Sequence, residues 1–132
     1  MIELISGLPD EVVGIEAVGT VTSSDYAEVA VPAVESALAR HGKIRLIHVL
    51  GERMKGHSPG AVWDDARLGV RHLRSFERIA VVTDSEPIRV AVKTGGWSVP
   101  GEMRLFSNAE REDAEAWASE GLHRPGREVR DE

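Results

Sequence analysis

The chain has 132 residues, a length typical of a single domain, and 42% of them are hydrophobic and 29% charged, which excludes a disordered chain. It contains no cysteine, which excludes disulfides, thiolate metal sites and cysteine nucleophiles, and we expect a reducing, cytoplasmic setting. A formal net charge of −6 disfavours nucleic-acid binding through a general basic surface, and we expect neither a signal peptide nor a transmembrane segment.

The first part of the chain predicts a β-hairpin followed by a helix. Met1–Ser6 and Val12–Val21 have the composition of strands, and a turn signal with glycine and proline joins them. Apolar residues then recur at helical spacing over residues 26–40, with candidate N-caps in Thr22–Asp25. Pro32 lies inside this pattern, so we expect a kink or break there, with the proline opening a second helical piece.

The rest of the chain predicts alternating strands and helices. The expected elements are strand Ile44–Leu50, loop Gly51–Gly60, helix Ala61–Phe76, strand Arg78–Thr83, a short helix through Lys93, strand Glu102–Phe106 and a final helix with a capping box at Ser107–Glu110. The order β-β-α-β-α-β-α-β-α predicts an α/β fold, a single-domain mixed sheet of about five strands with helices packed over it. We place this domain at residues 1–120 and a flexible polar tail at residues 121–132.

The charge is distributed unevenly, and this distribution indicates a candidate binding site. Residues 1–40 carry seven acids and one base, whereas residues 41–76 carry seven bases and three acids. Ligands of such sheets usually lie beyond the carboxyl ends of the strands, which here are Gly51–Pro59, Thr83–Pro87 and Ser107–Asn108. The positive loop is one of these ends.

Four residues of that loop are candidates for contact with an anion or an acidic protein surface: Arg53, Lys55, His57 and Ser58. Ser58 precedes the next predicted helix, whose free N–H groups and positive end favour an anion. The alternative is an ordinary capped helix start with solvated loop charges. The loop has no Walker spacing, so nucleotide hydrolysis is not supported.

Several short strings resemble the SpoIIAA-like family of the STAS-like superfamily, which is also compared with CRAL-TRIO lipid-carrier domains. They are Asp25-Tyr26 leading to Pro32, His41 to Leu46, Trp63-Asp64-Asp65, His72 with Phe76, Arg78 to Val82, Met103 to Phe106, and Glu112, Ala114 and Trp117. Together they extend over nearly all of residues 1–120. The resemblance implies a STAS-like fold and a non-enzymatic binding or regulatory domain.

One departure from the family concerns its best-known switch. Anti-anti-sigma factors carry a phosphorylatable serine in an Asp-Ser-Ser/Gly string at the helix start after the central strand. The equivalent stretch here, Gly56–Gly60, lacks that string. The resemblance therefore does not predict that phosphorylation controls the binding of sigma-factor partners by this chain.

No residue pattern indicates catalysis or a metal. The five histidines show no ligand spacing, and Asp64 and Asp65 are neighbours on a predicted helix, which directs their side chains about 100 degrees apart. We find no Gly-x-Ser-x-Gly elbow and no convergent nucleophile and base. We therefore expect no enzyme activity, no cofactor and no metal.

Two binding hypotheses remain open. The first is a domain that engages a protein partner or a small anionic ligand through the loop at residues 51–60, with a homodimer as a further possibility. The second is a carrier of a small hydrophobic ligand or lipid in a pocket between sheet and helices. Such a pocket would be reached past Trp97. This tryptophan follows two glycines in a loop, and it is either a packing lid over the sheet edge or an exposed contact for a partner.

Overall fold

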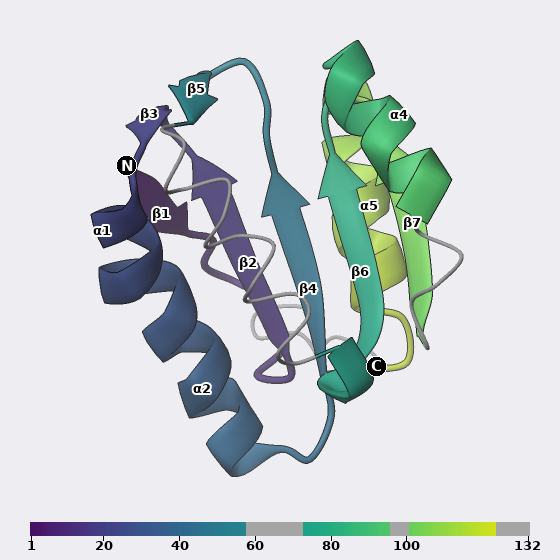
Figure 1. Ribbon diagram of the computed structural model, residues 1–132. Coiled ribbons are helices and arrows are strands. Elements are labelled where there is room, and N and C mark those ends of the chain that lie inside the picture. The colour runs from purple at the N-terminus through teal and green to yellow at the C-terminus, as the bar shows by residue number, and fades with distance from the viewer. Residues whose placement is uncertain (58–72, 96–100, 124–132) are drawn as a thin grey trace.

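A computed structural model describes residues 1–57, 73–95 and 101–123 of the chain (Figure 1). The strands are β1 Ile2–Leu4, β2 Val12–Ala17, β3 Gly19–Val21, β4 Ile44–Val49, β5 Met54–His57, β6 Phe76–Val82 and β7 Glu102–Phe106. The α-helices are α1 Ser23–Asp25, α2 Val31–Arg40, α4 Glu86–Gly95 and α5 Arg111–Ala118. A π-helix lies at Tyr26–Ala30, and single 3-10 turns lie at Leu73–Ser75 and Asn108–Glu110.

Five of these strands form one mixed sheet in the order β1-β2-β4-β6-β7. β1 runs antiparallel to β2, and β2, β4, β6 and β7 are parallel to one another. The register places Leu46 between Val13 and Ile79, and Ile79 next to Met103. The predicted hairpin, the parallel later strands and the mixed five-stranded sheet are therefore confirmed.

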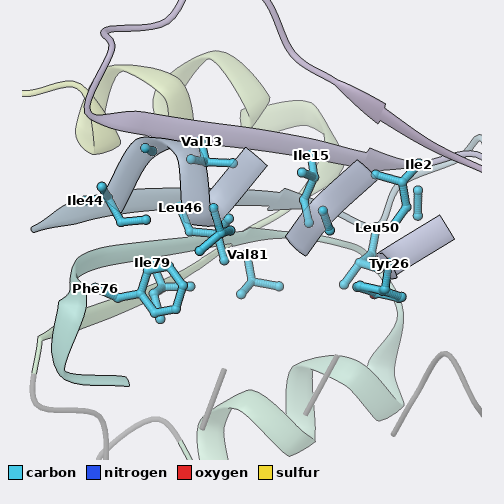
Figure 2. Packing of buried hydrophobic residues seen from close by; sticks show 14 of the residues in the cluster. Ile2, Val13, Ile15, Tyr26, Ile44, Leu46, Leu50, Phe76, Ile79 and Val81 are labelled. Atoms are coloured by element: carbon cyan, nitrogen blue, oxygen red, sulfur yellow. The ribbon is translucent and has the colours of Figure 1, made fainter. Parts of the chain in front are cut away.

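Helices cover both faces of the sheet (Figure 1). α2 and α4 lie over one face, where the larger buried cluster includes Val13, Ile15, Leu46 and Ile79 (Figure 2). α5 lies over the other face, where Ala114 and Ala118 are fully buried. Because alanine has a short side chain, α5 approaches the strands closely. The helices on the two faces bury most residues of β4 and β6 and every residue of β2.

The first helix is continuous through Pro32, but it changes its hydrogen-bond pattern there. Thr22 caps the start, since its hydroxyl accepts a hydrogen bond from the Asp25 N–H and its own N–H donates to the Asp25 carboxylate. The Val31 N–H then donates to the Tyr26 carbonyl in the wider π pattern. Proline has no N–H, so Pro32 fits at the start of α2, where this wider turn replaces the predicted kink.

The structure corrects three sequence-based boundaries. The predicted strand Val12–Val21 is interrupted at Val18, and Gly19 adopts a φ of +62°, a conformation that glycine adopts without strain. The predicted loop Gly51–Gly60 contains strand β5, which pairs in parallel with β3 in a separate two-stranded sheet. The predicted helix Ala61–Phe76 is wrong at its end, because Phe76 begins β6; its residues 61–72 lie outside the described ranges.

Candidate functional site

A cavity of about 160 Å³ lies at the edge of the sheet where the parallel strands end. Its lining comes from the ends of β2, β4 and β6 and from the segment that follows β7. The lining residues are Glu16, Val49, Gly51, Glu52, Arg53, Val82, Asn108 and Arg111. Two of the three chain segments that the sequence placed at this edge, Gly51–Pro59 and Ser107–Asn108, contribute to this lining, whereas β6 contributes Val82 and not the predicted segment Thr83–Pro87.

The carboxylate of Glu16 is the most buried charge of this site, with 6% of the residue exposed. Its Oε1 atom lies 3.2 Å from Arg111 Nη1 and 3.5 Å from Arg53 Nη1. Each arginine also contacts a second acid, Glu3 at 3.1 Å from Arg53 and Glu115 at 3.5 Å from Arg111. The two guanidinium groups offset the cost of burying the Glu16 charge, and they join the ends of β2 and β4 to the start of α5.

Asn108 forms another wall of the cavity, directly after β7. Its backbone N–H donates a 3.0 Å hydrogen bond to the Asp84 carboxylate, which links the ends of β6 and β7. Its side-chain oxygen is buried and has no hydrogen-bond partner among the described residues. A Cβ atom at Gly51 would lie 3.4 Å from this oxygen, so a glycine at position 51 lets the Asn108 amide pack against the backbone after β4.

Arg89 of α4 satisfies two carbonyl groups beside this cavity. Its Nη1 atom donates to the Thr83 carbonyl at 2.8 Å and to the Phe106 carbonyl at 3.3 Å. The Thr83 carbonyl follows β6, and the Phe106 carbonyl ends β7 and also accepts a 2.9 Å hydrogen bond from the Thr83 N–H. The arginine thereby attaches α4 to the same edge of the sheet.

The predicted site residues fall on or beside β5, as far as the structure describes them. Arg53 precedes β5, and 53% of its side chain is exposed although it contacts two acids. Lys55 is exposed on β5, and His57 ends β5 in register with Val21. Ser58 and Trp97 lie outside the described residues.

Sequence reasoning missed Glu16 and Arg111 as members of this site. The other residues of the strand that contains Glu16 are apolar or small. A lone acid in such a strand indicates that its carboxylate is buried and needs a partner of opposite charge. Arg111 begins the last helix and carries no comparable signal. His48, one of the five histidines, is buried in β4, with 6% of the residue exposed.

Trp117 and Met103, which belong to the strings that resemble the family, do not line this cavity. Trp117 is half-buried on α5 and Met103 packs at the border of the larger cluster, whereas Trp63, the pair Asp64 and Asp65, and His72 lie outside the described ranges. Residues 1–57, 73–95 and 101–123 contain no group of three or more histidines and acids arranged to hold a metal ion. Over the same residues, no helix has the length and apolar character needed to cross a membrane.

The parallel strands, the antiparallel first strand and the helices on both faces define a STAS-like α/β domain. The SpoIIAA-like family model matches residues 12–119, so the chain belongs to the SpoIIAA-like family. This finding confirms the family resemblance that the sequence strings indicated.

Two solved structures have the same fold. An uncharacterised protein of Shewanella loihica with a SpoIIAA-like fold is 32% identical, with a TM-score of 0.70 over 89% of this chain and 92% of that one. The anti-sigma factor antagonist SpoIIAA in its unphosphorylated form is 15% identical, with a TM-score of 0.53 over 86% of this chain and 96% of that one. A comparison with curated proteins gave no match.

Proposed function

We propose that the chain is a non-enzymatic binding or regulatory domain of the cytoplasm that engages a protein partner or a small anionic ligand through residues 51–60. One observation carries the proposal: the cations Arg53 and Lys55 are displayed on or beside β5, next to the cavity at the carboxyl edge of the sheet. β5 and β3 form a small sheet of their own at the margin of the main sheet (Figure 1), so a partner can reach these side chains without disturbing the core.

The two cations differ in how freely they can meet an anion. The Arg53 guanidinium contacts the carboxylates of Glu3 and Glu16, so an anion has to compete with these carboxylates for it. Lys55 has a flexible, strongly hydrated ammonium group on the exposed side of β5. Lys55 is therefore the residue whose reversal of charge should affect binding most, with the least effect on folding.

The experiment is thermal unfolding of the parent protein with inorganic phosphate and with a short acidic peptide as separate probes. The test variant is Lys55→Glu combined with Arg53→Gln, and the control is Lys43→Glu, an exposed lysine between α2 and β4. Stabilisation of the parent and the control but not of the test variant would support the proposal, since a ligand stabilises the form that binds it. No stabilisation by either probe, or an equal response of all three proteins, would refute it.

A second observation favours the carrier hypothesis as an alternative. A cavity of about 240 Å³ lies beside the β1–β2 connection and α2, and Leu4, Ile5, Leu8, Ala33 and Ala37 are among its lining residues. Native mass spectrometry of gently purified protein tests this alternative. Extra mass that disappears on denaturation would support it, and a bare protein mass would contradict it.

A further inference from the structure

β7 forms one edge of the main sheet, and in the described part of the chain no strand pairs with its outer side. The Phe106 carbonyl accepts a 2.9 Å hydrogen bond from the Thr83 N–H, so the backbone groups of Phe106 face β6. Backbone direction alternates along a strand, so those of Arg104 and Glu102 face β6 too. The N–H and C=O groups of Met103 and Leu105 therefore face away from β6, on the outer side of the sheet.

The side chains of β7 alternate in the same way. Met103 and Leu105 pack at the border of the larger apolar cluster, on the face that α2 and α4 cover. Glu102 and Arg104 lie on the opposite face, where the Arg104 guanidinium is 5.2 Å from the ring centroid of Trp117 in α5. Both charged side chains are exposed; 64% of the Glu102 side chain is accessible, and its Oε1 atom lies 3.3 Å from Arg78 Nε.

We infer that β7 pairs with β7 of a second copy of this chain, antiparallel and about a two-fold axis through Met103. Met103 then faces its own equivalent, and the two residues exchange a pair of backbone hydrogen bonds. Glu102 lies opposite Arg104 of the second copy, and Arg104 lies opposite Glu102. Side chains that are directly opposite have Cβ atoms about 4.5–5.5 Å apart, which suits two cross-strand ion pairs.

The charges select this register over its neighbours. An axis through Arg104 would place two arginines opposite each other, and like charges in that position destabilise a strand pair. An axis through Leu105 would form neither ion pair. Charged residues usually protect an edge strand from pairing, but an acid and a base two positions apart become complementary when a two-fold axis passes between them.

Such a dimer would contain one continuous sheet across both copies. Because the two β7 strands are antiparallel, the carboxyl edges of the two halves would face opposite ends of the assembly. The two candidate sites built around Glu16 and β5 would then be presented in opposite directions. This inference goes beyond the proposed function and does not depend on it, since β7 takes no part in the contacts of Arg53 or Lys55.

Charge reversal gives a test with an internal control. Sedimentation equilibrium of the parent, Glu102→Arg, Arg104→Glu and the double variant Glu102→Arg/Arg104→Glu measures the dimer dissociation constant at protein concentrations up to about 1 mM. We expect each single variant to weaken the dimer by about tenfold or more, because both ion pairs become like-charge contacts. The double variant should recover association, and an equimolar mixture of the two single variants should form a heterodimer.

A backbone variant tests the same interface without changing its charge. Met103→Pro removes an N–H that faces away from β6, and proline is tolerated on edge strands, so the variant should fold but not dimerise. Leu4→Pro is the matched control on the other edge, because the Leu4 N–H also faces away from its neighbour β2. Circular dichroism verifies folding. A monomeric parent, or a dimer that Met103→Pro and the single charge reversals leave unchanged, would overturn the inference.

Discussion

The guanidinium of Arg78 lies 5.0 Å from the ring centroid of Trp117 and donates a 2.7 Å hydrogen bond to the carbonyl of the same residue. Arg45, on the neighbouring strand, donates to the carbonyls of Ala118 at 3.0 Å and Glu120 at 2.8 Å. These carbonyls lie at or just beyond the end of α5, where the last carbonyl groups of a helix lack the N–H donor of the next turn. Two strand arginines therefore satisfy the end of α5 and hold it on the sheet.

Replacing Arg78 should loosen this end of α5. Arg78→Met removes a charged donor to a helix-end carbonyl, and we expect it to lower the free energy of unfolding by about 1–3 kcal/mol. Arg78→Lys should recover only part of this loss. A planar guanidinium can stack on the indole and donate a hydrogen bond at the same time, whereas an ammonium group cannot do both. Urea unfolding measures both effects.

The control is Lys93→Met, which removes an exposed cation from the last turn of α4. We expect this change to alter the free energy of unfolding by less than about 0.5 kcal/mol. Equal urea midpoints for Arg78→Met and the parent would mean that other contacts hold α5 in place.

The main sheet was predictable because its strands carry strong local signals. The apolar runs that became β4 and β6 are long enough to indicate strands buried on both faces. β7 has the predicted bounds Glu102–Phe106, and the capping box at Ser107 forms with Glu110. In each case neighbouring residues in the sequence determine the element.

The small sheet and the charge cluster were not predictable from local signals. β5 has the sequence Met-Lys-Gly-His, which contains no β-branched residue and no alternation, so only its pairing with β3 makes it a strand. The contact between Glu16 and Arg111 joins the first parallel strand to the last helix. No sequence spacing encodes such a contact, because it arises from the packing of the whole domain.

The Glu16 cluster predicts unequal roles for its two arginines. Arg111 lies closer to the Glu16 carboxylate than Arg53, 3.2 Å against 3.5 Å, and its side chain is less exposed, 36% against 53%. We expect Arg111→Met to lower the free energy of unfolding by about 1–3 kcal/mol and Arg53→Met by less than about 1 kcal/mol.

A double-mutant cycle with Glu16→Gln isolates the ion pair in this prediction. In the Glu16→Gln background, Arg111→Met should cost clearly less, since no buried carboxylate then loses its partner. An unchanged cost in both backgrounds would show that Arg111 stabilises the protein through Glu115 or through packing, and not through Glu16.

Gly14 should tolerate no larger residue without repacking. A Cβ atom there would lie 2.6 Å from Leu8 Cδ1 and 2.9 Å from Ile5 Cβ, so Gly14→Ala should lower the free energy of unfolding by about 1–3 kcal/mol. Gly42→Ala is the control, because nothing lies within 4 Å of a Cβ atom at that position. Adding Leu8→Ala to Gly14→Ala should cost less than Leu8→Ala does in the parent, as the shortened side chain removes the closest contact.

Asp10 predicts a defined pH dependence of stability. Its carboxylate accepts hydrogen bonds of 2.8 and 3.2 Å from Arg40 and lies 2.7 Å from His41 Nε2. The hydrogen bonds from Arg40, and next the contact with His41, lower the pKa of Asp10 below its usual value of 3.8. A lowered folded-state pKa stabilises the protein above the unfolded-state value, and this stabilisation is lost as the pH falls through the folded-state pKa.

Asp10→Asn should therefore lower the melting temperature most near neutral pH. The difference between the variant and the parent should become progressively smaller in acid. The measurement is thermal unfolding of both proteins from about pH 7 to about pH 2, the range in which a carboxyl group with a lowered pKa is titrated. Glu35→Gln, which changes an exposed acid of α2, is the control. A melting-temperature difference for Asp10→Asn that stays constant to the lowest pH would contradict this prediction. It would mean that protonating Asp10 does not remove its stabilising effect, so that this effect does not depend on the negative charge of the carboxylate.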